Sequence, residues 1–338
     1  MKAVFFEKYG GLEVLKYGEF PTPKPQQGEA LVRVRACGLN HLDIWLRNGA
    51  SKVSLPHIVG SDVSGVIAEI NAKSNFKVGD EVVINPERAC GTCERCQKVK
   101  ACGMVNLLAR QTNGGYAEYI CVSLEQVYPK PKKLSFVEAA AFPLTFLTAW
   151  HALHTRASLE KDETVFVWGA SGNLGPAVIQ ISKYFGAKVI AAVRSEEVGK
   201  IVKSWGADEI ILYSKENVIE RVKELTGGKG VDVVFESVGE KTFPQSMAML
   251  KPYGRIVVVG ATSGEKISFN LSDFYPKQFS IIGSRMGAKE EFEDILKLIN
   301  AGTLKPVIDE IFPLSQATDA QRRMEEGKHI GKIVLEVP

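Results

Sequence analysis

The chain has 338 residues, of which 45% are apolar and 24% are charged. This length suits two domains of roughly 100–200 residues each. The 42 basic and 39 acidic residues leave a net charge of +3, which is too small to indicate nucleic acid or an anionic membrane as a partner. No run of about 18 apolar residues occurs, and the apolar run at the N-terminus is too short for a signal peptide. We therefore expect a cytoplasmic protein that does not bind a membrane.

Short runs rich in valine and isoleucine dominate the first 130 residues. They occupy residues 29–38, 60–70, 80–84 and 116–122, and glycine, proline or aspartate bounds them. Such runs are typical of β-strands. A proline-rich segment at 128–135 follows, and the pattern of apolar and polar residues changes just after it. The first part of the chain is therefore predicted to be a β-rich domain.

From about residue 135 the pattern alternates between helix and strand. Residues 136–153 are helix-like, although Pro143 should break or bend that helix. Strands without a clean two-residue period, separated by helices of ten or more residues, indicate a parallel sheet covered on both faces. The tail is predicted to contain a helix at 289–302, a strand at 306–312, a second helix and a closing strand at 331–337. The expected strands before this tail are 164–169, 187–193, 208–213, 231–239 and 254–260, and helices lie between them.

The segment GASGNLG, residues 169–175, lies between an expected strand and an expected helix. Glycine is required where such a turn is tight, where backbone approaches a pyrophosphate and where the helix packs on its strand. The helix N-terminus then offers free N–H groups and the positive end of its dipole to phosphates. The loop predicts a dinucleotide site, and the alternative is that its glycines serve packing alone.

The end of the second expected strand bears on the choice of coenzyme. NAD-binding chains usually place an acidic residue there, which binds the ribose 2′-hydroxyl. Val193 holds that position, and Arg194 follows it. A guanidinium suits a 2′-phosphate, although an exposed arginine can also be merely solvated. We therefore expect NADP(H), with NAD as the alternative.

Four of the six cysteines, Cys90, Cys93, Cys96 and Cys102, lie within thirteen residues. Four thiolates at this spacing can close a tetrahedron around Zn²⁺ and leave no open position. The cluster predicts one structural zinc per chain. The alternatives are a reduced lobe without metal and an iron–sulfur cluster.

Seven motifs are spread along the chain: ACGLNHLD at 36–43, VGDEVV, the cysteine cluster, GGYAEY, GASGNLG, FESVG and GRIVVVG. Together they resemble the medium-chain dehydrogenase/reductase superfamily, which contains zinc alcohol dehydrogenases and zinc-free quinone oxidoreductases. The resemblance implies an α/β protein. Its GroES-like catalytic domain would comprise residues 1–130 and 286–338, and a Rossmann coenzyme domain would comprise residues 131–285. It also implies a homodimer or homotetramer.

The resemblance places the family's catalytic zinc ligands on residues that do not bind zinc well. The first ligand falls on Asn40, the second on Ser61 and the third near Leu144. The family's proton-relay positions fall on Leu42 and Trp45, which carry no relay group. The segment around Asn40 instead resembles the zinc-free quinone oxidoreductases.

Both proposed metal sites have an alternative. A displaced catalytic zinc on Cys37, His41 and Asp62 is the alternative to a zinc-free site, although Cys37 is expected in the core. The family's fourth structural cysteine falls on Met104, and a loop shortened by two residues would put Cys102 in its place.

The resemblance and the motifs together give the candidate site residues. His41 falls where zinc alcohol dehydrogenases often hold the cofactor pyrophosphate, and Phe142 and Phe274 are expected to add apolar walls. The candidate catalytic residues are Asn40, His41, Asp43, Trp45, Ser61, Asp62 and Leu144. The candidate cofactor contacts are Thr148, Gly169, Ala170, Ser171, Gly172, Asn173, Leu174, Gly175, Arg194, Ser195, Tyr213, Ser237, Val238, Gly239, Gly260, Ala261 and Thr262.

A zinc-free site needs hydrogen-bond donors for the oxygen charge that develops during hydride transfer, and each is worth about 3 kcal/mol. The candidate donors are the Asn40 amide, Ser61, His41 and a ribose hydroxyl of the cofactor. Conjugated acceptors already delocalise that charge. We therefore expect NAD(P)H-dependent reduction of a small quinone, enone or enal. The alternatives are a zinc-type alcohol dehydrogenase acting on alcohols or aldehydes, and a non-catalytic NADPH-binding protein.

Overall fold

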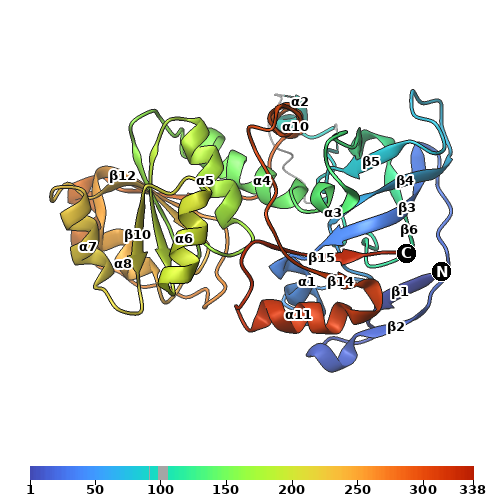
Figure 1. Cartoon of the computed structure of the whole chain (residues 1–338), viewed down its shortest axis with the longest axis horizontal. Helices are drawn as coiled ribbons and strands as arrows, with labels where there is room; N and C mark the ends of the chain where they lie inside the picture. The colour runs from blue at the N-terminus through green and yellow to red at the C-terminus, as the bar shows by residue number, and fades with distance from the viewer. Residues whose placement is uncertain (91, 98–105) are drawn as a thin grey trace. The chain divides into compact units, whose positions relative to one another are not determined.

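The computed structural model describes residues 1–90, 92–97 and 106–338 (Figure 1). Within these ranges, residues 95 and 97 are described by their backbone alone. The chain forms two compact units. The first comprises Met1–Thr145 and Gly287–Pro338, and the second comprises Phe146–Met286. Residues 131–145, which the sequence assigned to the coenzyme domain, belong to the first unit. The reason is that helix α3 (Phe136–Ala139) packs on strands of the first unit.

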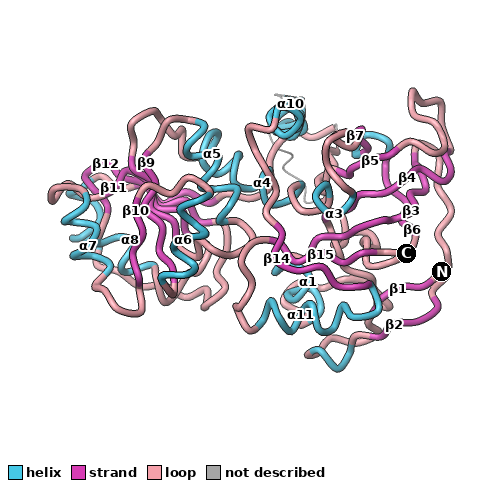
Figure 2. Tube along the Cα trace, in the orientation of Figure 1, coloured by secondary structure: helices cyan, strands magenta, loops and turns pink. Residues whose placement is uncertain are grey.

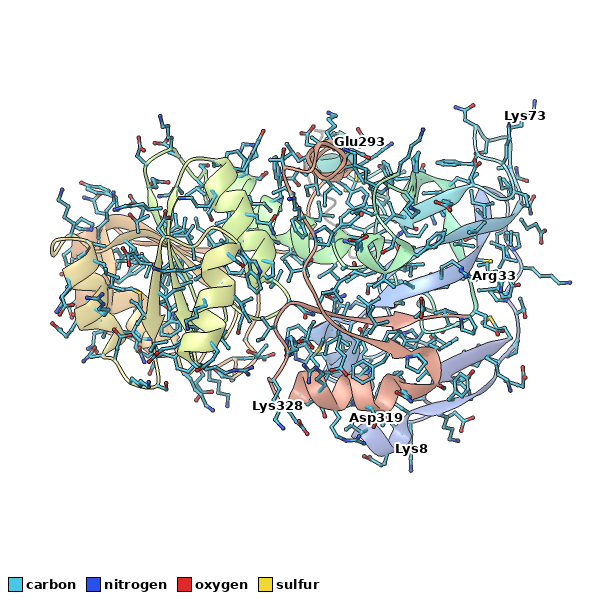
Figure 3. The ribbon with its side chains drawn as sticks, in the orientation of Figure 1. Lys8, Arg33, Lys73, Glu293, Asp319 and Lys328 are labelled. Carbon is cyan, nitrogen blue, oxygen red and sulfur yellow. The ribbon has the colours of Figure 1, made fainter. Side chains whose placement is uncertain are left out.

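The first unit is built on a seven-stranded sheet. Most strands are antiparallel, with β3 (Glu29–Gly38) and β4 (Asp62–Ile70) at the centre (Figure 2). Strand β3 alternates between buried residues such as Val32 and Val34 and the exposed Arg33, which points outward (Figure 3). The other strands are β5 (Glu81–Ile84), β6 (Tyr119–Ser123), β7 (Val127–Pro129), β14 (Ile308–Pro313) and β15 (Lys332–Glu336).

The remaining elements of the first unit flank this sheet. Strands β1 (Lys2–Phe5) and β2 (Lys16–Glu19) form a separate antiparallel pair. A continuous apolar core joins β1 to the inner face of the large sheet and to α11. The helices are α1 (His41–Arg47), α2 (Glu94–Gln97), α10 (Lys289–Ala301) and α11 (Ala317–Glu325).

The second unit is a parallel sheet of six strands in the order β10-β9-β8-β11-β12-β13. Helices α5 and α6 cover one face, and α7 and α8 cover the other (Figure 1). The strand order reverses between β8 and β11, which is where parallel sheets of this class bind ligands. The elements are β8 (Thr164–Val167), α5 (Gly175–Tyr184), β9 (Lys188–Val193), α6 (Glu196–Ser204), β10 (Glu209–Leu212), α7 (Val218–Leu225), β11 (Val231–Glu236), α8 (Phe243–Ala248), β12 (Leu250–Val258), α9 (Leu271–Phe274) and β13 (Ser280–Gly283).

One helical stretch, Phe136–Arg156, is long and apolar enough to cross a membrane by length and composition, contrary to the expectation from the sequence. However, 78% of its most apolar window is buried inside the structure, as in the core helix of a soluble protein. The stretch is also interrupted as predicted, because helix α3 ends at Ala139 and α4 (Pro143–Trp150) begins at Pro143. A proline is tolerated at the start of a helix, where its missing N–H would have no partner.

Candidate active site

The register of three strands brings distant polar residues together. Gly38, at the end of β3, lies opposite Asp62 on β4 and opposite Val334 on β15. The pairing with β15 continues beyond the strand end, because the Leu39 N–H donates to the Ile333 carbonyl at 2.9 Å. Asn40 and Lys332, the next residues along the two antiparallel chains, therefore face each other. Their side chains meet Asp62 in the interior of the first unit.

Asn40, Asp62 and Lys332 form a closed hydrogen-bonded triad. The Lys332 ammonium donates to Asn40 Oδ1 at 2.7 Å and to Asp62 Oδ2 at 2.6 Å. The Asn40 amide donates from Nδ2 to the same Asp62 oxygen at 2.9 Å. The remaining oxygen of Asp62 accepts the Leu144 N–H at 2.6 Å, at the first turn of α4. Asp62 thus holds a buried cation, an amide and a helix N-terminus at once.

The sequence predicted only part of the triad. Asn40 and Asp62 were predicted as site residues, whereas Lys332 was missed. A lysine at the start of an otherwise apolar closing strand is the signal that could have found it, because a charged residue is seldom buried without a partner. Lys332 is only 1% exposed. Room for its side chain comes from Gly38, where a Cβ atom would lie 2.7 Å from Lys332 Cε.

Three of the other predicted residues line or support this region in different ways. Ser61 is fully buried and donates its hydroxyl proton to the Leu108 carbonyl at 2.9 Å, so that proton is already used. This contradicts the expectation that Ser61 donates to a substrate. Leu144 and Trp45 are partly exposed. Leu144 meets the triad through its backbone, and its side chain offers no ligand to a metal.

His41 opens helix α1 beside the triad. The centre of its ring lies 6.3 Å from that of Trp45 and 6.3 Å from that of His329. Like Lys332, His329 was not among the site residues predicted from the sequence. Burial and, to a smaller degree, the Lys332 charge lower the pKa of His41. The imidazole is therefore neutral at pH 7.

Asp43 supports the site rather than facing it. Its carboxylate is fully buried and accepts the N–H groups of Asn40 at 2.9 Å and Gly60 at 3.1 Å, and the Tyr116 hydroxyl at 3.1 Å. The first contact caps α1 and leaves the Asn40 side chain available to the triad. Burial raises the pKa of Asp43 to about 6, against these hydrogen bonds.

The described residues around the triad do not fit a catalytic zinc. Both oxygens of Asp62 are engaged, and the Lys332 ammonium beside them would repel a divalent cation. Cys37 is fully buried in the core, as predicted, and burial raises the pKa of its thiol well above the usual range. Among the described residues, the ligand atoms of Cys37, His41 and Asp62 do not come close enough together to share one metal ion, whereas those of Cys90, Cys93 and Cys96 do. The displaced site is therefore not assembled.

The predicted phosphate loop lies at the carboxyl end of β8, where the strand order reverses. Gly169 has a left-handed backbone with φ of 61°. A Cβ atom on Gly175 would lie 1.8 Å from the Ala170 carbonyl oxygen, so the helix α5 can begin this close to its strand only with glycine there. The other residues of the loop, Ser171, Gly172, Asn173 and Leu174, are partly exposed and follow the strand directly.

A buried glutamate holds the neighbouring loop. Glu236 ends β11, and its Oε1 accepts the N–H groups of Val238 at 2.8 Å and Gly239 at 3.0 Å. The hydroxyls of Thr242 and Ser246 also donate to this carboxylate. Further hydrogen bonds tie the loop to the predicted segment 260–262 after β12, including one from the Thr262 N–H to the Ser237 carbonyl at 3.4 Å.

The residues expected to decide between NAD and NADP lie at the carboxyl ends of β9 and β10. Arg194 and Ser195 follow β9, and Ser195 caps α6 by accepting the Val198 N–H at 3.4 Å. Tyr213 follows β10, is 49% exposed, and donates its N–H to the Val193 carbonyl. Val193 is buried and offers no carboxylate to a ribose. Thr148, also predicted, is buried on α4, and its hydroxyl contacts Met286.

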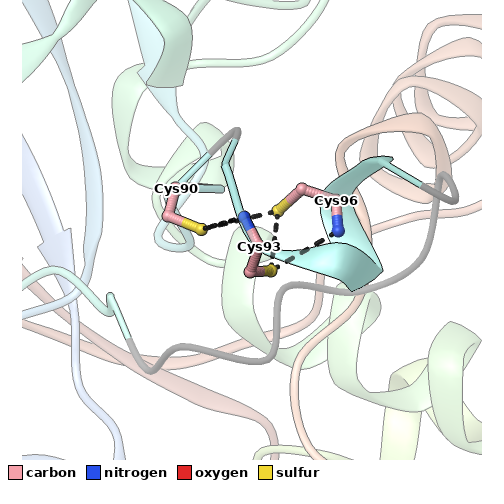
Figure 4. A group of neighbouring side chains, drawn as sticks. All are labelled: Cys90, Cys93 and Cys96. Atoms are coloured by element: carbon pink, nitrogen blue, oxygen red, sulfur yellow. Dashed lines mark hydrogen bonds between the residues drawn. The ribbon is translucent and has the colours of Figure 1, made fainter.

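Three of the four clustered cysteines come together as predicted (Figure 4). The sulfur atoms of Cys90, Cys93 and Cys96 lie within 4.8 Å of one another. Backbone N–H groups of Cys93 and Cys96 also point at the sulfur three residues earlier, at 3.4 Å and 3.5 Å. These donors favour thiolates, so the group fits a Zn²⁺ ion. Cys102, the fourth predicted ligand, lies outside the described residues.

Comparisons with known proteins agree with this architecture. Residues 26–132 match the family described as alcohol dehydrogenase GroES-like domain, and residues 174–301 match the zinc-binding dehydrogenase family. A quinone oxidoreductase from Pongo abelii is 34% identical and is covered over 97% of its length by 99% of this chain. An NAD-dependent alcohol dehydrogenase from Sulfolobus acidocaldarius is 32% identical over the full length of both chains. The crystal structure of an NAD-dependent alcohol dehydrogenase superposes with a TM-score of 0.96 at 40% identity over both whole chains.

These similarities extend over the whole chain and exceed the level at which only a fold is shared. The chain belongs to the medium-chain dehydrogenase/reductase superfamily. It is an oxidoreductase, and the GroES-like and Rossmann folds predicted from its sequence are confirmed.

Proposed function

We propose that this enzyme transfers hydride from NADPH to an activated carbonyl acceptor, a quinone, enone or enal, without a catalytic zinc. The observation that carries the proposal is the triad of Asn40, Asp62 and Lys332. A lysine ammonium is bound where polar residues would otherwise be available to a metal. The similarity to a quinone oxidoreductase supports the same acceptor class.

The chemistry follows from the groups that remain. A reduced nicotinamide coenzyme bound at the glycine loop would supply the hydride, with its two electrons, and would be oxidised in return. The acceptor takes those electrons, and a proton from solvent completes its new hydroxyl group or C–H bond. The charge that develops on the acceptor oxygen needs a positioned donor, and Asn40 supplies one. An isolated alcohol would need a metal-bound alkoxide instead, which the described residues around the triad do not support.

The coenzyme proposal rests on the second unit. The glycine loop presents a helix N-terminus at the point where the strand order reverses. Arg194 and Ser195 follow β9 in place of a carboxylate, which favours a 2′-phosphate. We assign Cys90, Cys93, Cys96 and Cys102 to one structural zinc, which would fix their loop and take no part in the reaction.

The acceptor is identified by a rate panel. NADPH oxidation is measured with menadione, methyl vinyl ketone, crotonaldehyde and acetone, and NADP⁺ reduction is measured with benzyl alcohol. The proposal predicts turnover of the three conjugated acceptors and little reaction with acetone or the alcohol. Faster oxidation of benzyl alcohol than reduction of menadione would contradict it.

Alcohol dehydrogenase activity is the second candidate, because the superposed NAD-dependent alcohol dehydrogenase is 40% identical. The same panel separates the two, since only this candidate predicts efficient alcohol oxidation. It also predicts that NAD⁺ serves as well as NADP⁺.

We further propose that the chain forms a homo-oligomer through the free edge of β13. This strand ends the parallel sheet and exposes Ile281, and the preceding segment exposes Leu271 and Tyr275 at 68% and 69%. An edge strand beside apolar side chains pairs readily with a second copy of itself. Ile281→Lys should lower the mass in analytical ultracentrifugation, whereas Ile201→Lys on α6 should not. An unchanged mass for Ile281→Lys would contradict this interface.

A further inference from the structure

The carboxamide of Asn40 is held in one orientation by two chemically different partners. An amide side chain has an oxygen and a nitrogen of similar size, so only its partners decide which one points where. Lys332 is a donor without acceptor capacity and must therefore contact Oδ1. Asp62 Oδ2 accepts, and so must contact Nδ2.

The contact with Asp62 uses one of the two Nδ2 protons. The second proton has no acceptor among the described residues. Asn40 is 4% exposed, whereas Asp62 is not exposed at all and Lys332 is 1% exposed, so Asn40 is the most exposed residue of the triad. An ammonium on Oδ1 also draws electron density from the amide, which strengthens its N–H groups as donors.

We propose that Lys332 is the positioning residue of this active site: its ammonium fixes the Asn40 carboxamide so that the second Nδ2 proton meets the developing oxyanion of the acceptor. The inference rests on the proposed function. Lys332 acts through Asn40 and not on the substrate. Removing Lys332 would free Oδ1 and leave the carboxamide held through Nδ2 alone. The amide could then tilt, and its second Nδ2 proton would no longer be aimed at the acceptor oxygen.

The test compares Lys332→Met, Asn40→Ala and the double variant Asn40→Ala/Lys332→Met, with Lys297→Met as the matched control. Lys297 is 75% exposed on α10 and pairs with Asp294. The measured quantities are kcat for menadione reduction and the Kd for NADPH from fluorescence. Each single variant should lose about 100-fold in kcat, the usual effect of one oxyanion donor. The Kd for NADPH and the control kcat should stay unchanged.

The double variant decides whether Lys332 acts through Asn40. Its kcat should be no lower than that of Asn40→Ala, because a positioning residue has nothing left to position. Multiplied losses in the double variant, or full kcat in Lys332→Met, would overturn the inference while leaving the proposed function intact. A wild-type enzyme that reduces none of the conjugated acceptors would instead overturn both.

Lys332→Met leaves the Asp62 carboxylate buried without its cation, which can prevent folding. The variant Asp62→Asn/Lys332→Met removes both charges and keeps this test decisive. It should fold and still show the loss in kcat, and wild-type kcat would overturn the inference. The side-chain ¹⁵N–¹H signals of Asn40 give a readout independent of turnover: they should shift in either Lys332 variant and stay in place in Lys297→Met. Unshifted signals would also overturn the inference.

Discussion

The substitution Glu236→Gln tests how the Rossmann unit holds its coenzyme loop. Two backbone N–H groups of that loop, from Val238 and Gly239, donate to Glu236 Oε1 at 2.8 Å and 3.0 Å. A hydrogen bond to a charged group contributes about 1.5–3 kcal/mol, and a neutral one about 0.5–1.5 kcal/mol. Removing the charge from two such bonds should therefore cost about 2 kcal/mol, since the shape of the side chain is kept.

The loss should be visible in stability and in coenzyme binding. A loss of about 2 kcal/mol lowers the Tm of a unit of this size by about 5 °C. If more than half of the lost energy also loosens residues 237–239 in the bound state, the Kd for NADPH rises about tenfold. Both are measured on Glu236→Gln and on Glu240→Gln, a neighbouring exposed glutamate that serves as the control. Wild-type Tm and Kd in Glu236→Gln would refute the assignment of this carboxylate to the loop.

Three further predictions follow from single sites. Arg194→Ala should raise the KM for NADPH severalfold and leave that for NADH unchanged in steady-state assays; equal changes in both would show that Arg194 does not read the 2′-phosphate. Asp43 has a folded pKa of about 6 against 3.8 unfolded, so its contribution to stability is present below pH 4 and is lost as pH rises through 6. As the pH rises from about 4 to about 6, the unfolding free energy of the wild type should fall by about 3 kcal/mol relative to that of Asp43→Asn. A difference between the two unfolding free energies that does not change with pH would contradict this. Cys93→Ser should abolish zinc binding, measured by plasma mass spectrometry, and lower the Tm; a variant that keeps one zinc per chain would remove Cys93 from the ligand set.

Local patterns made most of the fold and half of the site predictable. The glycine loop and the cysteine cluster each lie within one short stretch of sequence, and the parallel sheet is built from consecutive strand–helix units. Their chemistry can be inferred from spacing, because a strand, a turn and a helix in sequence fix their own geometry. The interruption of the long helix at Pro143 was predictable for the same reason.

The contacts within the triad were not predictable, because strand pairing creates them. Asn40 and Lys332 meet only through the register of β15 on β3, and nothing near either residue indicates that register. The role of Ser61 was also misjudged, since its hydrogen bond to Leu108 depends on a loop far along the chain. Residues 131–145 were placed with the wrong unit because the sequence shows where a helix begins but not which sheet it covers.

The central claim is that reduction proceeds with no metal ion at the reacting oxygen. The most direct measurement is kcat for menadione reduction, taken together with the zinc content of the same sample, before and after treatment with a zinc chelator. The comparison uses protein whose circular dichroism is unchanged by the treatment. The account predicts that kcat stays constant as zinc is removed. A kcat that falls in proportion to the zinc lost, and returns when zinc is added back, would contradict it.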